Sequence, residues 1–247
     1  MTIPKIHDMA LGADDLIGLG LLKSHIHVLH GDIDEDNIAE AIKWIIFENT
    51  DDKDKVLTLY INSNGGSLCD AFALIDIMRN SKYPVQTIGM GSVMSAAFMI
   101  FVAGTKEYRY LAKNTSILCH QFSENVEGKY HDLKSSLKEN ENMNDRMVQL
   151  LRECTDLSTR VIKTKLLPPS DVWLTVNEAV ELGVADHILW GGSLKTEMLG
   201  GKKFHKTVKT KFKKQEDENL LLKNKKKHHD KSTYRMLRQQ QKEDYVI

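Results

Sequence analysis

The sequence predicts an α/β fold in which parallel strands alternate with helices. Val56–Asn62 is a short, apolar, β-rich run that ends in a glycine turn, and a helical pattern of apolar residues begins at Leu68. Pro84–Gly89 is typical of a second strand, and a further glycine turn leads into an apolar helix expected at Ser95–Ala103. This repeated order of strand, turn and helix predicts parallel strands joined by right-handed crossovers.

The flanking segments extend the same scheme. Upstream, Ile26–Leu29 predicts a strand and Asp36–Phe47 an amphipathic helix. Downstream, Thr115–His120 predicts an apolar strand that ends in a histidine. Thr175–Glu178 is a capping box that starts another helix, and Ala185–Leu189 predicts a last strand.

One long helix is predicted between Gly128 and Glu153. Asn140 and Asn144 interrupt its narrow apolar stripe. The stripe consists of Tyr130, Leu133, Leu137, Met147 and Leu151. A helix with so narrow a stripe is expected to project from the body or to pack against a partner.

The formal net charge of zero conceals a division of the chain. Residues 1–190 contain 18 Lys and Arg against 27 Asp and Glu, and residues 191–247 contain 16 against 7. An acidic body is therefore followed by a basic tail with little apolar periodicity. Such a tail is either a solvated extension or an arm that binds nucleic acid or an acidic partner, and both alternatives stay open.

The composition also bears on location and metal binding. The first residues do not combine a basic region with an apolar run, and the longest apolar stretch, Ala96–Ala103, is too short to span a bilayer. Cys69, Cys119 and Cys154 form no CxxC pair, so neither a disulfide framework nor a metal site is suggested. We expect a cytoplasmic protein that contacts no membrane.

Three known kinds of site place a glycine turn between a strand and a helix, and the sequence before Ser95 fits one of them. A GxGxxG phosphate site fails because Met94 stands where the third glycine is needed, and a GxSxG elbow also fails at Ser92 and at Ser95. The third alternative makes Ser95 a nucleophile at the start of a helix, where the next backbone amide can stabilise an oxyanion. His120, at the end of a neighbouring strand, is then the candidate base.

Four segments together resemble the ClpP family of serine peptidases, the proteolytic subunits of ATP-dependent Clp proteases. These are YINSNGGS (60–67), GMGSVMSAAF (89–98), ILCHQF (117–122) and PSDVWLTVNEAVELGVADHIL (169–189). The resemblance implies a ClpP/crotonase-like spiral of β-α-β units with a projecting handle helix at about 128–153. It divides the chain into an N-terminal, axial gating segment (1–20), a peptidase domain (21–190) and the tail (191–247).

Carried over by position, the resemblance implies a role for each site residue. Ser95 is the nucleophile, His120 the general base and Asp171 the carboxylate that orients the imidazole, while the amides of Gly66 and Ala96 form the oxyanion hole. It implies no metal and no cofactor in this subunit.

The chain departs from the family pattern near these positions. Asn64 and Phe122 replace prolines, Ala96-Ala97 replaces methionine-glycine, and the segment between His120 and Asp171 is about two residues longer.

The function implied is hydrolysis of unfolded polypeptides inside a chamber of stacked heptameric rings, with an AAA+ unfoldase that uses ATP. Two alternatives share the fold: an ATPase-independent maturation peptidase, such as one that trims a viral scaffold, and a non-catalytic ring subunit. A crotonase-type acyl-CoA enzyme is a third alternative, although its chemistry has no need for the serine and histidine.

Overall fold

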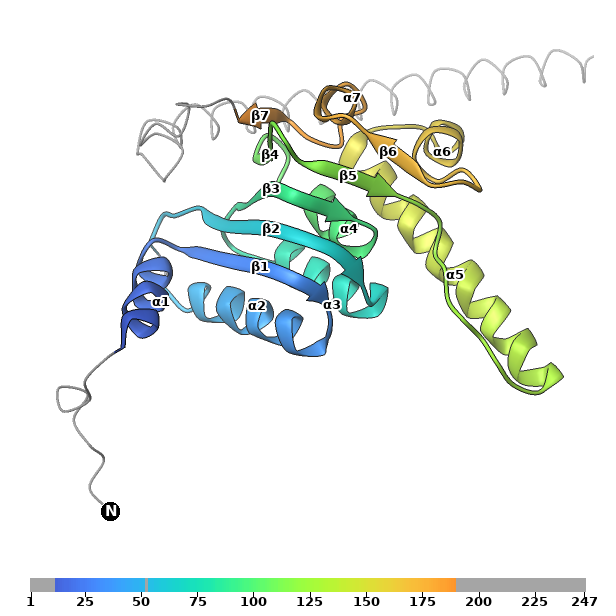
Figure 1. Cartoon of the computed structure of the whole chain (residues 1–247). Helices are drawn as coiled ribbons and strands as arrows, with labels where there is room; N and C mark the ends of the chain where they lie inside the picture. Colours follow the sequence, from blue (N-terminus) through green and yellow to red (C-terminus); the bar gives the residue numbers. More distant parts are fainter. Residues whose placement is uncertain (1–11, 52, 190–247) are drawn as a thin grey trace, which may run out of the picture. The chain divides into compact units, whose positions relative to one another are not determined.

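The computed structural model describes residues 12–51 and 53–189, in which seven strands form one sheet with helices packed against it (Figure 1). The strands are β1 (Ile26–Ile33), β2 (Leu57–Gly66), β3 (Val85–Met94), β4 (Arg109–Ala112), β5 (Ser116–Cys119), β6 (Val172–Leu174) and β7 (His187–Leu189). Their order is β1-β2-β3-β4-β7, all parallel, and β5 joins β3 in parallel and β6 in antiparallel pairing. This is the mixed α/β architecture that the alternating pattern predicts.

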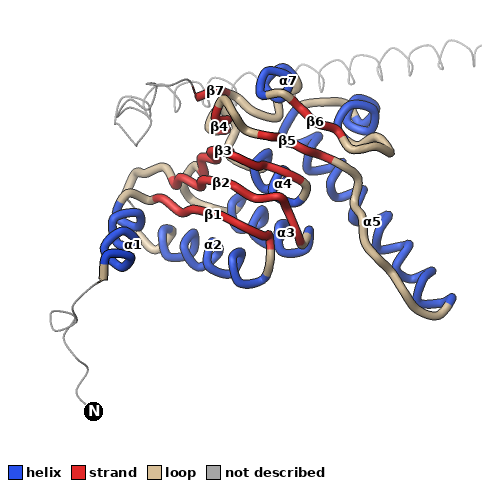
Figure 2. The backbone as a smooth tube through the Cα atoms, in the orientation of Figure 1, coloured by secondary structure: helices blue, strands red, loops and turns tan. Residues whose placement is uncertain are grey.

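The helices connect these strands, as the colouring by secondary structure in Figure 2 shows. They are α1 (Ala13–Lys23), α2 (Glu35–Glu48), α3 (Leu68–Arg79), α4 (Ala96–Val102), α5 (Tyr130–Thr155), α6 (Thr159–Val161), which continues into a π-helical turn (Ile162–Leu166), and α7 (Val176–Glu181). Side-chain caps start several of them: Asp34 begins α2, Ser67 begins α3 and Thr175 begins α7 with its capping box. No helix in the described ranges is long and apolar enough to cross a membrane.

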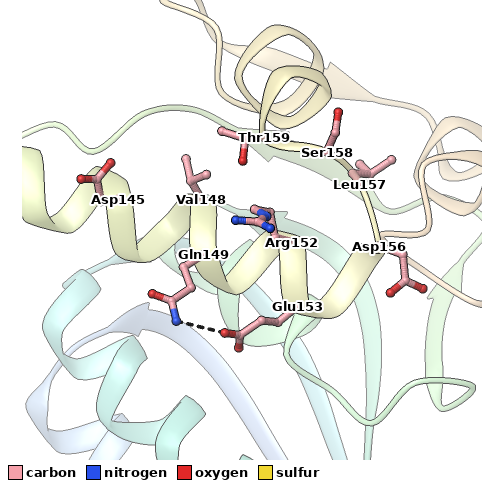
Figure 3. Close-up of a pocket in the computed structure, with 9 residues that line it drawn as sticks. All are labelled: Asp145, Val148, Gln149, Arg152, Glu153, Asp156, Leu157, Ser158 and Thr159. Carbon is pink, nitrogen blue, oxygen red and sulfur yellow. Dashed lines mark hydrogen bonds between the residues drawn. The ribbon is translucent and has the colours of Figure 1, made fainter. Parts of the chain in front are cut away.

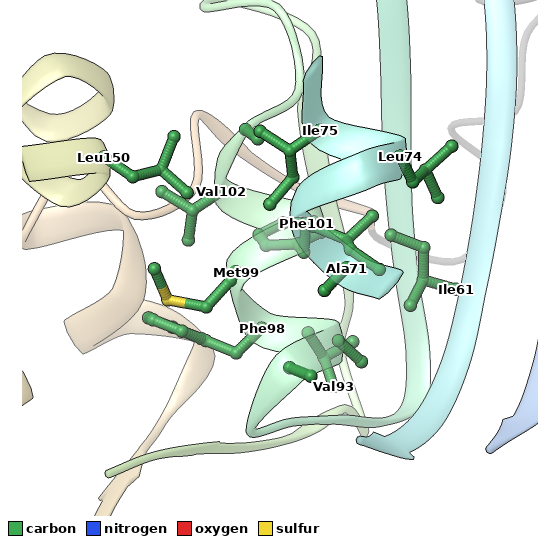
Figure 4. Packing of buried hydrophobic residues seen from close by; sticks show 14 of the residues in the cluster. Ile61, Ala71, Leu74, Ile75, Val93, Phe98, Met99, Phe101, Val102 and Leu150 are labelled. Carbon is green, nitrogen blue, oxygen red and sulfur yellow. The ribbon is translucent and has the colours of Figure 1, made fainter. Parts of the chain in front are cut away.

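The core lies between the sheet and helices α2, α3 and α4, and α4 is its centre. All seven residues of α4 are buried. Figure 4 shows Phe98, Met99 and Phe101 among side chains of β2, α3 and α5. A helix this deeply packed holds the residue before it, Ser95, in a fixed place relative to the sheet.

Strand β3 changes partner halfway along its length. Residues 87–89 pair with β4, and residues 92–94 pair with β5. Between the two halves the β2–β3 register shifts, because Ile61 pairs with Gly89 but Ser63 pairs with Val93. One β2 residue thus faces three residues of β3, which is a bulge.

Helix α5 extends away from the sheet, with its first turns outermost (Figure 1). Tyr130, Leu133 and Leu137 are exposed there, whereas Met147 and Leu151 are buried near the core. The predicted stripe is therefore divided between a free end and a packed end.

Helix α1 was not predicted. It contains residues 13–20 of the expected N-terminal segment and extends to Lys23, across the expected boundary at residue 21. Strands β4 and β6 were not predicted. Residues 1–11 and the basic tail lie outside the described residues.

Candidate active site

Ser95 occupies a strained turn between β3 and α4. Its backbone has φ 54° and ψ −121°, a conformation that a residue with a side chain rarely adopts. Its amide donates to the Leu118 carbonyl of β5 at 2.9 Å, and its hydroxyl does not cap the helix. The turn therefore leaves the half-buried hydroxyl free for another partner.

That partner is His120, the first residue after β5. The hydroxyl of Ser95 lies 2.8 Å from Nε2 of the His120 ring. The other ring nitrogen, Nδ1, lies 2.5 Å from the Gln121 carbonyl oxygen, which can only accept a hydrogen bond. Nδ1 therefore carries the proton, and Nε2 presents a lone pair to Ser95, as a general base requires.

Of the glycine pair at the end of β2, Gly65 packs directly against this turn and Gly66 packs against the end of β1. Gly65 has φ +105°, and a Cβ there would lie 2.6 Å from the Cβ of Ser95 and 3.1 Å from the Ala96 nitrogen. Gly66 has φ +150°, and a Cβ there would lie 2.3 Å from the Ile33 carbonyl oxygen. Only glycine, which has no side chain, allows the end of β2 to approach both the Ser95 turn and β1 this closely.

A pocket of about 230 Å³ joins these groups. Its lining residues are Gly66, Leu68, Ser95, Ala96, His120, Gln121, Phe122, Ser123 and Met147. Four of the five residues expected in the site thus surround one hollow: the serine, the histidine and the two candidate oxyanion donors.

A larger hollow of about 940 Å³ lies along the second half of α5 (Figure 3). Its lining includes Asp145, Arg152, Glu153 and Asp156 but no histidine. It holds no serine in contact with a histidine, as Ser95 is with His120, so size alone does not identify the reactive site, and we place the chemistry in the smaller pocket.

Asp171, the fifth expected site residue, is not among the residues that line the pocket around Ser95 and His120. It precedes β6, and the antiparallel pair Cys119–Val172 places residue 171 across from His120. Yet its side chain is exposed, and the Gln121 carbonyl, not the Asp171 carboxylate, contacts Nδ1 of His120.

Two side chains to which the sequence analysis gave no role in the site, Gln121 and Asn144, hold the segment after His120. Gln121 donates from Nε2 to the Leu167 carbonyl at 2.9 Å, and the Phe122 amide donates to Oδ1 of Asn144 at 3.0 Å. Asn144, which looked like an interruption in the stripe of α5, thus links the handle helix to the site. Sequence signals for such contacts are weak, because both depend on residues more than twenty positions away.

Cys119, directly before His120, does not compete as a nucleophile. Its side chain is buried, and burial raises the pKa of its thiol to about 12. A thiol with such a pKa stays protonated and unreactive at neutral pH.

Comparison with known proteins agrees with this geometry. Residues 13–191 match the model of the Clp protease family. The chain is 30% identical over 175 residues to ATP-dependent Clp protease proteolytic subunit 2 of Treponema denticola, an alignment that covers 71% of this chain and 86% of that protein. A ClpP-type fold with a serine and a histidine in contact at its sheet edge, together with these matches, shows that the chain belongs to the Clp protease family.

Proposed function

We propose that the protein is a serine endopeptidase that cleaves unfolded polypeptides, with Ser95 as nucleophile and His120 as general base. The observation that carries the proposal is the 2.8 Å contact between the Ser95 hydroxyl and Nε2 of His120, beside the pocket that Gly66 and Ala96 also line.

The reaction follows from the positions of these groups. Nε2 of His120 takes the hydroxyl proton as Ser95 Oγ attacks the scissile carbonyl carbon, and the backbone amides of Gly66 and Ala96 donate to the oxyanion that forms. The imidazolium then gives its proton to the leaving amine, and water hydrolyses the acyl-enzyme by the same steps. Removing one oxyanion donor typically costs on the order of 10²–10³ in turnover.

Asp171 is proposed as the orienting carboxylate, which requires its side chain to turn from solvent toward the ring. Its place across from His120, next to the Cys119–Val172 pair, supports this proposal, because directly opposed residues of an antiparallel pair lie close together. The carboxylate would then replace the Gln121 carbonyl as acceptor and stabilise the imidazolium by its charge.

The free end of α5 supports an oligomeric chamber. Tyr130, Leu133 and Leu137 are 71%, 42% and 59% exposed on a helix that reaches away from the sheet. A second copy of the chain that packs on this stripe would bury it, and the relative's description as a proteolytic subunit is consistent with such an assembly. We propose homo-oligomeric, paired heptameric rings in the cytoplasm that receive substrates from an AAA+ unfoldase, which supplies the ATPase activity.

The nucleophile is tested with a fluorophosphonate probe. We expect the wild-type protein to be labelled at Ser95 and the Ser95→Ala variant to remain unlabelled. Ser116→Ala, at an exposed position on β5, is the matched control and should label normally. Labelling that persists in Ser95→Ala would refute the assignment, and a wild-type protein without labelling would favour the non-catalytic ring subunit.

The chamber is tested by measuring the mass of the native particle. Leu137→Asp places a charge on the apolar stripe and should halve the particle, whereas Ser135→Asp adds the same charge at an exposed polar position and should not. A wild-type monomer would contradict the chamber. Cleavage of a folded protein without ATP would favour the ATPase-independent maturation peptidase over an unfoldase-fed one.

A further inference from the structure

The bulge in β3 separates the half of this strand that pairs with β4 from the half that leads to Ser95. Before the bulge, β3 pairs with β4; after it, β3 pairs with β5, the strand that His120 follows. The Ser95 amide continues that second pairing by its hydrogen bond to the Leu118 carbonyl. The distance between the Ser95 hydroxyl and the His120 ring therefore depends on how the bulge is held.

Asn62 of β2 holds the bulge from one side. Its Oδ1 accepts a hydrogen bond from the Ser92 amide at 2.9 Å, so the side chain replaces the backbone partner that the register shift removes. The Gly91 backbone has φ +62° and lies so close that a Cβ there would stand 2.5 Å from Oδ1 of Asn62. Only glycine at position 91 therefore leaves room for the Asn62 side chain at this place.

Two further contacts complete the arrangement. Nδ2 of Asn62 lies 3.1 Å from Nδ1 of His30 on β1, which ties the side chain across three strands. On the other side, the buried Thr115 hydroxyl contacts the carbonyl oxygens of Gly89 and Ala112 at 3.0 and 2.8 Å, next to the start of β5. Side chains thus satisfy backbone groups on both sides of the bulge.

We propose that Asn62 is a positioning residue for the peptidase reaction: it fixes the bulge that transfers β3 to β5 and thereby sets the contact between Ser95 and His120. The inference rests on the proposed roles of these two residues. Asn62 itself touches neither of the reacting side chains. It acts through the backbone of residues 92–95.

The test compares Asn62→Ala with Asn62→Asp. The alanine removes the acceptor of the Ser92 amide, and a misplacement of about 1 Å at the site should lower kcat and the rate of fluorophosphonate labelling on the order of 10- to 100-fold, with KM nearly unchanged. The aspartate keeps an acceptor at the same place, so it should restore the rate to within about threefold of wild type. Asn80→Ala, at the exposed end of α3, is the matched control and should label normally.

The failure of the inference and the failure of the proposed function are distinguishable. If the wild type labels and Asn62→Ala labels equally fast, at a temperature well below its unfolding midpoint, Asn62 is only structural and the inference fails. If the wild type does not label at all, the proposed function fails. In that case a crystal structure of Asn62→Ala still decides the inference: a Ser95–His120 contact that stays near 2.8 Å overturns it, and a clearly longer one supports it.

Discussion

Replacing Gly65 by alanine disturbs the close packing of β2 against the Ser95 turn. The new Cβ would lie 2.6 Å from the Ser95 Cβ and 2.9 Å from the Met94 carbonyl oxygen, whereas ordinary van der Waals contact begins at 3.4 Å. The end of β2 and the Ser95 turn must therefore separate by roughly 0.8 Å. Since φ is +105°, alanine also adds backbone strain on the order of 1–3 kcal/mol.

This separation should affect catalysis more than folding. It moves the Gly66 amide away from Ser95, and displacements of this size cost on the order of 10²-fold in rate. We expect Gly65→Ala to label with a fluorophosphonate probe about 10²-fold more slowly than wild type at a temperature where both are folded.

The matched control is Gly20→Ala in α1. Nothing lies within 4 Å of its Cβ position, so this alanine should leave labelling unchanged and stabilise the helix by about 0.5–1 kcal/mol. Labelling of Gly65→Ala at the wild-type rate would refute the argument that the close packing of β2 on the Ser95 turn shapes the site.

Three further predictions concern other parts of the molecule. Asp171→Asn should lower kcat by about 10²–10⁴ without raising KM; unchanged kinetics would show that the Gln121 carbonyl alone orients His120. Arg109→Met should lower the free energy of unfolding, measured with urea, by about 3–5 kcal/mol. The reason is that Asp186 loses the buried guanidinium that contacts both of its carboxylate oxygens, at 2.7 and 2.9 Å. A loss below about 1 kcal/mol would contradict this explanation. Burial lowers the pKa of His27 below 6.5, against a smaller opposing effect of Glu40, so the unfolded chain takes up a proton at a higher pH than the folded one. The resulting loss of stability begins as pH falls through about 6.5, and urea titrations at about pH 7.5 and 5.5 should show a smaller loss in His27→Leu than in wild type; equal losses would contradict the assignment.

The sequence predicted those helices and strands whose formation depends on residues close together in the chain. The apolar run before the glycine pair, the helical spacing after Leu68 and the Thr175 capping box each specify their element within a few residues, and the structure has all three. The contact between Ser95 and His120 was also predictable, because parallel strands place their carboxyl ends at one edge of a sheet.

Strands β4 and β6 and the bulge in β3 depend on residues far away in the chain, so no short sequence pattern predicts them. Strand β4 is four residues long and contains a buried arginine, which is tolerated only because Asp186, 77 residues away, pairs with it. Strand β6 exists through its pairing with β5. The bulge held by Asn62 is invisible in a linear pattern, because the asparagine and Ser92 meet only once β2 and β3 have paired.

The complete burial of α4 has a consequence for how the protein loses activity. A helix without exposed residues at the centre of the core cannot fray by itself, and its amides exchange with solvent only when the whole domain opens. The nucleophile is attached to this helix, so heat or denaturant should abolish reactivity in step with global unfolding.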